Sequence, residues 1–185
     1  MSTLKLHAIA TVSLFCLGTY AAHAENPMVG GGAMYETKTI VDNAMNSKDH
    51  TTLVAAVKAA GLVDTLKGAG PFTVFAPTNA AFDALPAGTV DKLLKPEHKA
   101  ALTKVLTCHV VAADAMASTI GRMIEDDGGE HDIKTLGGCI LKAKMDGDKL
   151  TLTDETGGVA TVTIADVDQS NGVIHVIDRV LMPKS

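Results

Sequence analysis

Residues Gly70–Phe82 have the sequence GPFTVFAPTNAAF, and the rest of the chain is best understood from this stretch. A turn ending at Pro71 leads into the β-branched and aromatic run 72–75, and Pro77 breaks that run before Thr78, a favourable residue for capping a helix N-terminus. The stretch therefore predicts a strand, a stop and a helix. Three of the four Phe residues of the chain lie within it, and because Phe buries a large apolar area we expect the core to form here. It contains no chemically reactive side chain, which favours a non-catalytic protein.

The first 24 residues have the pattern of a cleaved signal peptide. Lys5 gives a positive start, residues 8–19 form an apolar run, and Ala22-His23-Ala24 supplies the small residues that precede a cleavage site. The apolar run is shorter than a helix that spans a bilayer. We therefore expect residues 1–24 to be removed and the product to be secreted or periplasmic.

The composition limits the classes of partner. The 185-residue chain has a formal net charge of −5 and no cluster of basic residues, which disfavours nucleic-acid binding. Beyond residue 24 no apolar run approaches the length of a membrane span, so none is expected. The length corresponds to one domain that can bury its own core.

Residues 25–36 are rich in glycine and contain Pro27, a composition that buries little surface. We expect them to form a flexible leader before a folded domain over residues 37–183. The nearby residues Met28, Met34, Met45 and His50 would be suitable copper ligands, although methionine at such positions is more often core or filler.

The hydrophobic pattern changes period along the chain. Apolar residues recur at helical spacing through the first two thirds, and from residue 133 they alternate with polar ones, as in strands with one covered face. The predicted helices are 37–47, 52–60, 78–85, 89–94, 96–106 and 114–123. The predicted strands are 72–75, 107–111, 133–136, 140–145, 150–153, 159–164 and 173–181. The fold class is therefore α+β, with N-terminal helices packed on an antiparallel or mixed β wedge.

The histidines and acidic runs do not form a recognisable cofactor site. His109 and His175 lie between apolar neighbours in predicted strands, where a buried and hydrogen-bonded histidine is typical. The acidic segments 125–132 and 146–148 lack the ligand spacing of a calcium-binding loop. We predict no metal and no cofactor, with a periplasmic carrier of a small ligand or of a metal, such as haem or copper, as the alternative.

Two cysteines, Cys108 and Cys139, remain after removal of the signal peptide. In an oxidising compartment an isolated pair favours a disulfide, which would close a loop of about 30 residues. The alternative is that both are small buried thiols.

Three motifs together are similar to a known family. The stretch Gly70–Phe82, the segment LTCHVV at 106–111 and the segment NGVIHVIDRVLMP at 171–183 follow one another in the order found in the fasciclin domain. The resemblance covers residues 37–183 and is to the stand-alone, secreted bacterial type. It implies a compact wedge-like domain in which the first and last motifs are adjacent central strands, and a role in adhesion or extracellular binding.

The resemblance departs from the family at two places. Where the family usually has Tyr-His this chain has Cys108-His109, so integrin recognition associated with that pair in animal members is not carried over. The Asp-Ile pair that precedes the last strand in animal members corresponds to Asp166-Val167, which preserves only the first residue.

The function predicted from these observations is a non-catalytic extracytoplasmic binding module. It would mediate adhesion or surface association with a protein or glycan partner, as a monomer or weak oligomer. The candidate binding residues are Asp166, Val167, Asp168 and Asn171 in the predicted loop before the last strand, together with His109. A hydrolase is the less favoured alternative, because the chain lacks a nucleophile elbow and HExxH, and Cys108 and His109 would face opposite sides of a strand.

Overall fold

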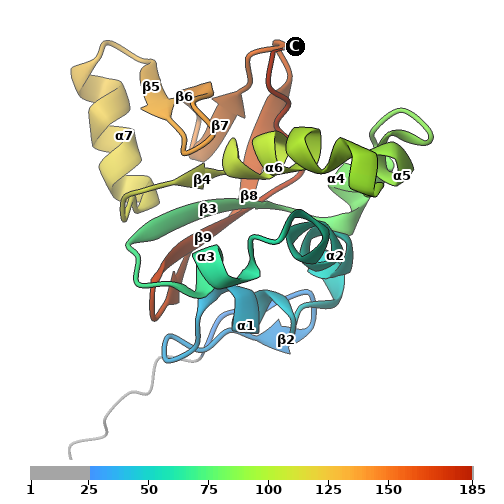
Figure 1. Ribbon diagram of the computed structural model, residues 1–185. Helices are drawn as coiled ribbons and strands as arrows, with labels where there is room; N and C mark the ends of the chain where they lie inside the picture. Colours follow the sequence, from blue (N-terminus) through green and yellow to red (C-terminus); the bar gives the residue numbers. More distant parts are fainter. Residues whose placement is uncertain (1–25, 185) are drawn as a thin grey trace, which may run out of the picture.

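The computed structural model describes residues 26–184, so the predicted signal peptide lies outside the described residues. A seven-stranded mixed sheet with the order β4-β3-β9-β8-β7-β6-β5 forms its centre, and a separate two-stranded hairpin, β1-β2, precedes it (Figure 1). The strands are β1 (Met28–Val29), β2 (Gly32–Ala33), β3 (Phe72–Pro77), β4 (Val110–Val111), β5 (His131–Lys134), β6 (Ile140–Asp146), β7 (Lys149–Thr153), β8 (Val159–Gln169) and β9 (Gly172–Ile177).

Helices cover this sheet in two groups (Figure 1). The first group packs with β3 and β9 around one hydrophobic core, and α7 packs with β5–β8 around a second. The α-helices are α1 (Ile40–Ala44), α2 (Thr51–Ala60), α3 (Val63–Lys67), α4 (Asn79–Asp83), α5 (Thr89–Leu93), α6 (Lys99–Thr107) and α7 (Ala117–Asp126), and the 3-10 helices are η1 (Lys48–His50) and η2 (Pro96–His98). The predicted α+β architecture is confirmed.

The predicted central strand β3 joins the two cores. It pairs in parallel with β9 along its whole length and antiparallel with β4. Since alternate side chains of a strand point to opposite faces, Val74 enters the first core and Phe75, which is fully buried, enters the second. After the strand, the Thr78 side chain accepts a hydrogen bond from the Ala81 backbone and caps α4, as predicted.

The start of the β3–β9 pair requires glycine. Gly172 has φ of +148°, and a Cβ atom there would lie 1.9 Å from the carbonyl oxygen of Phe72. Any side chain at this position would therefore push the two central strands apart.

The prediction that residues 107–111 form one strand is wrong. Cys108 follows α6 in helical conformation, its N–H still bonds to the Lys104 carbonyl, and only Val110–Val111 form β4. The buried residues Leu102, Val105 and Leu106 continue to His109 at helical spacing, so the helical period extends into the β-branched segment.

Part of the segment predicted as a flexible leader, residues 25–36, forms the hairpin β1–β2 in the structure. Gly30 and Gly31 have φ values of +58° and +75°, the conformation that a tight hairpin turn needs between β1 and β2. The hairpin places Val29 and Met34 in the first core, with exposed fractions of 4% and 2%. These two apolar side chains anchor the glycine-rich segment.

None of the helices within residues 26–184 is long and apolar enough to cross a membrane.

Candidate functional surface

The predicted loop before the last strand belongs to β8, which runs on to Gln169 and pairs with β9. The pairing shifts register between Val162 and Ile164 and again between Ile164 and Val167. At this second bulge Asp166 has φ of +55°, the one positive value for a non-glycine residue within residues 26–184. Asp tolerates this conformation better than most residues, and the bulge turns its side chain outward.

The Asp166 side chain, although distant in sequence, caps the N-terminus of α7. Its Oδ1 atom accepts a hydrogen bond of 2.7 Å from the backbone of Ala117, the first residue of the helix, and Met116 at the N-cap position provides no side-chain bond. A carboxylate at this position also interacts favourably with the positive end of the helix dipole. The helix predicted over residues 114–123 therefore begins later, at Ala117, and extends to Asp126.

His175 supports the same bulge from inside. Its Nδ1 accepts a hydrogen bond of 3.2 Å from the Asp166 backbone, so its Nε2 carries the proton and donates to the Ala115 carbonyl at 2.8 Å. Burial lowers the pKa of His175, although the bond to Ala115 and the charge of Asp166 oppose this shift. The predicted buried, hydrogen-bonded histidine is confirmed, and neither ring nitrogen is free for a ligand.

Four carboxylates from distant segments gather beside the bulge, and we call them the acidic surface. They are Glu36, Asp114, Asp166 and Asp168. Burial raises the pKa of Asp168, and the negative charges of the other three raise it further. Within residues 26–184 none of the four forms an ion pair with Lys or Arg, and no group of three or more metal-ligating side chains is placed to hold a metal ion. The surface therefore carries uncompensated negative charge, which attracts cationic groups.

The other predicted binding residues point inward. Val167 is fully buried in the first core. The Asn171 side chain accepts a hydrogen bond from the Ile40 backbone at 3.0 Å and donates to the carbonyls of Leu66 and Gly68 at 2.8 and 3.0 Å. It joins the β8–β9 turn to the start of α1 and the end of α3, and its contacts are within the fold.

The hydrogen bonds of His109 involve none of the residues of the acidic surface. Its Nδ1 donates to the Val105 carbonyl at 2.8 Å and its Nε2 accepts from the Leu181 backbone at 2.9 Å. Burial lowers the pKa of His109 to about 4, against the opposing effects of the Val105 bond and the charge of Asp154. The ring is thus neutral and fully engaged within the protein.

The cysteines form the predicted disulfide. Cys108 and Cys139, both 1% exposed, are joined with a Cα–Cα distance of 5.4 Å, well within the usual range for a disulfide. The bridge fixes the end of α6 to the turn between β5 and β6, where the Gly137 backbone also donates to the Thr107 carbonyl. Because Cys108 is bonded, it provides no thiolate for catalysis.

The candidate copper residues do not share one surface. Met28 and Met45 are 60% and 47% exposed, whereas Met34 and His50 are buried. The His50 Nδ1 is hydrogen-bonded to the Ser47 hydroxyl at 2.8 Å.

Sequence reasoning missed Glu36 and Asp114 as parts of the acidic surface, because they reach Asp168 only through the folding of distant segments. It also missed Asp154, a buried carboxylate that accepts hydrogen bonds from the backbones of Thr156, Gly158 and Met182. The short Asp-Glu-Thr-Gly-Gly segment at 154–158 is a local signal for such a turn.

Comparison with known proteins gives a consistent result. A family model described as Fasciclin domain matches residues 48–183. Protein sll1483 of Synechocystis sp. is 47% identical over 159 residues, which cover 86% of this chain and 81% of that protein. Cell surface glycolipoprotein MPB83 of Mycobacterium bovis is 37% identical over 166 residues, which cover 90% of this chain and 64% of that protein.

A solved structure is similar in fold. It is a FAS1 domain pair from the insect cell adhesion molecule Fasciclin I, with a TM-score of 0.55 and 20% sequence identity over 70% of this chain and 43% of that one.

Proposed function

This chain belongs to the fasciclin domain family, and from that premise we propose that it is a non-catalytic extracytoplasmic binding module for adhesion or surface association with a protein or glycan partner. The proposed adhesion or surface-association role agrees with how two similar proteins are described: one is a cell surface glycolipoprotein and the other is a cell adhesion molecule. The proposed location is outside the cytoplasm, in agreement with the signal-peptide pattern of residues 1–24.

A non-catalytic role agrees with the state of the side chains that could perform chemistry. Cys108 is held in a disulfide, and His109 and His175 are buried, with both ring nitrogens of each in hydrogen bonds to the protein. A general base or nucleophile needs a free atom that can reach a substrate. These three residues offer none.

The observation that carries the proposed contact surface is the uncompensated charge of the acidic surface. Asp166 is held by a strand bulge and caps α7, and Asp168 lies in the part of β8 that pairs regularly with β9, so the positions of both are fixed before a partner arrives. Their charges, with those of Glu36 and Asp114, would attract a basic patch. Within the broader proposal we therefore favour a protein partner with exposed Lys or Arg over a neutral glycan.

Binding measurements on isosteric variants test this proposal. The purified exported protein is first used to capture partners from the cell envelope and from a glycan array. The double variant Asp166→Asn and Asp168→Asn removes two charges but keeps the oxygen that accepts from Ala117. We expect affinity for the captured partner to fall at least tenfold and its salt dependence to weaken.

A matched control is the double variant Asp146→Asn and Asp148→Asn, which removes the same charge from the exposed turn between β6 and β7. This control should bind as the wild type does. Equal loss in both double variants would show a general charge effect, and unchanged binding in the Asp166 and Asp168 variant would remove the acidic surface from the contact.

A further inference from the structure

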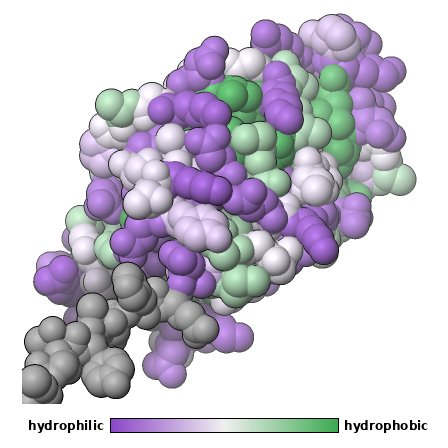
Figure 2. All heavy atoms as spheres, turned by 90° about the horizontal axis from the view of Figure 1, so that it is seen from below, coloured by the Kyte–Doolittle hydropathy of each residue, from purple (hydrophilic) through white to green (hydrophobic). Residues whose placement is uncertain are grey.

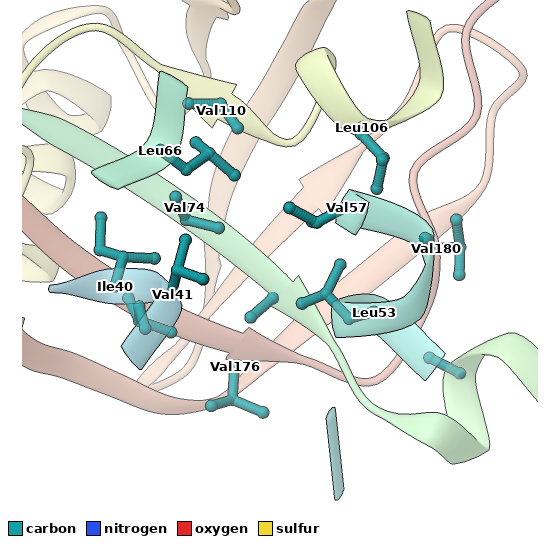
Figure 3. Close-up of a cluster of buried hydrophobic side chains, with 14 of the residues drawn as sticks. Ile40, Val41, Leu53, Val57, Leu66, Val74, Leu106, Val110, Val176 and Val180 are labelled. Atoms are coloured by element: carbon teal, nitrogen blue, oxygen red, sulfur yellow. The ribbon is translucent and has the colours of Figure 1, made fainter. Parts of the chain in front are cut away.

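An apolar cavity lies between the helices α1–α3 and the strands β3 and β4. Its volume is about 40 Å³, and no polar atom contributes to its wall. Aliphatic side chains from six elements, α1, α2, α3, α6, β3 and β4, line it. Figure 3 shows several of them, among them Val41 of α1, Val57 of α2 and Val74 of β3. The short, branched side chains leave this space unfilled.

The inner end of the cavity includes the rings of His109 and Phe75. Since both nitrogens of His109 are engaged by Val105 and Leu181, the ring adds only carbon surface to the wall. Water in a cavity needs two or more polar partners, so this one favours an apolar occupant.

The outer end has a different character. Val54 and Val63 are half-buried and Lys58 is exposed. Lys58 is the one charged residue that lines the cavity, and it has no ion pair within the part of the chain that the structure describes. A lysine stem can lie along an apolar rim while its ammonium group stays in water. The site thus combines an apolar interior with a free positive charge at its entrance.

Seen from the side of α1 and β2, the molecular surface is largely hydrophilic, with a band of hydrophobic residues across its upper part (Figure 2).

The size of the cavity limits what fits. A volume of 40 Å³ has room for about three water-sized groups, which excludes an aromatic ring and suits the end of an unbranched aliphatic chain. We propose that the cavity binds the aliphatic end of an acyl-chain anion, with the negative headgroup of the ligand at Lys58. This site shares no residue with the acidic surface, so it does not depend on the proposed function.

A series of carboxylates of increasing chain length tests whether the cavity binds the aliphatic end of the ligand. Acetate, propanoate, butanoate, hexanoate and octanoate are titrated into the isotope-labelled protein, and amide shifts are followed by NMR. We expect saturable shifts confined to α1–α3, β3 and β4. Because about three methylene-sized groups fill the cavity, binding should tighten about fourfold per added methylene up to butanoate and then level off. An absence of saturable shifts with octanoate, or shifts centred elsewhere, would overturn the proposal.

Two variants separate the apolar and the ionic contacts. Lys58→Met should weaken octanoate binding at least fivefold and leave 1-octanol binding unchanged, whereas Lys92→Met on α5 should change neither. The double variant Val41→Ile and Val57→Ile fills the cavity and should weaken both ligands at least tenfold. If that variant fails to fold, Lys58→Met still decides, because an equal effect on octanoate and octanol refutes the ionic contact.

The acyl chain can come from a free acid or from a membrane lipid. Co-sedimentation with phosphatidylglycerol vesicles that octanoate abolishes would assign the site to a lipid chain. Saturable octanoate binding without co-sedimentation would assign it to the free acid.

Discussion

Replacement of Asn171 by Ala tests whether this residue is structural, as its contacts indicate, or a binding residue. In the folded protein its side chain accepts from the Ile40 backbone and donates to the carbonyls of Leu66 and Gly68. The change to Ala leaves all three backbone groups without this partner. They belong to α1 and to the end of α3, so the loss would weaken the helical layer over β9.

The magnitude follows from the number of bonds. A net contribution of about 1 kcal/mol per hydrogen bond predicts a loss of roughly 3 kcal/mol in the free energy of unfolding. For a domain of this size each kcal/mol lowers the melting temperature by about 2–4 °C, so a decrease of roughly 6–12 °C is expected.

Urea denaturation with two reference variants is the appropriate assay. Ser170→Ala changes the exposed neighbouring residue and should leave the midpoint within experimental error of the wild type. Asn171→Asp retains an acceptor for Ile40 but places a negative charge against two carbonyl oxygens, so it should be at least as unstable as Asn171→Ala. If Asn171→Ala unfolds as the wild type does and yet loses partner binding, the structural assignment is refuted and the original binding prediction is restored.

Three further predictions concern stability. Phe75→Ala should cost roughly 3–5 kcal/mol because the ring is fully buried, and an unchanged urea midpoint would show that the side chain is not part of the core. Reduction of the Cys108–Cys139 bridge should cost about 3–4 kcal/mol in the chain-entropy model, visible as a lower melting temperature; two titratable thiols in the native protein would contradict the pairing. Hydrogen bonds from the Met182 backbone, Thr156 and Gly158 hold the pKa of Asp154 below its ordinary value despite the opposing effect of burial. The charged form therefore stabilises the fold above the unfolded pKa of about 3.9, and the difference in unfolding free energy between wild type and Asp154→Asn should shrink as pH falls below that value. A difference that stays constant in acid would argue against this assignment.

Local patterns were sufficient where the structure depends on neighbours in sequence. Thr78 caps α4, and Gly61 ends α2 with φ of +73°, as their residue types predict. The alternation of Leu150 and Leu152 with threonine gives a strand whose apolar face is buried. In each case the determining contact lies within four residues or follows from a fixed period.

Local patterns failed where distant segments decide the outcome. The glycine-rich residues 30–32 suggested flexibility, yet Val29 and Met34 on either side are held by a core formed mainly by later residues. Similarly, the segment 107–111 has the composition of a strand, but the helix before it continues because Leu106 and His109 occupy successive buried positions. Composition reports the preference of a segment, and packing against the rest of the fold overrides it.

The predicted binding residues separate for a physical reason that the sequence does not reveal. Successive residues of a strand alternate between faces, so a regular β8 would send Asp166 and Asp168 to one side and Val167 to the other. That alternation explains why Val167 is buried, but a regular strand would not give Asp166 its outward position at the end of α7. The bulge does so, and its stability depends on His175 inside and on the Ala117 backbone outside.

Selection for the fold therefore accounts for Val167, Asn171, His109 and the capping oxygen of Asp166. The negative charge of Asp168, which burial and its three acidic neighbours both disfavour, has no such structural reason, and it is the residue of the original set for which a binding role is the stronger explanation.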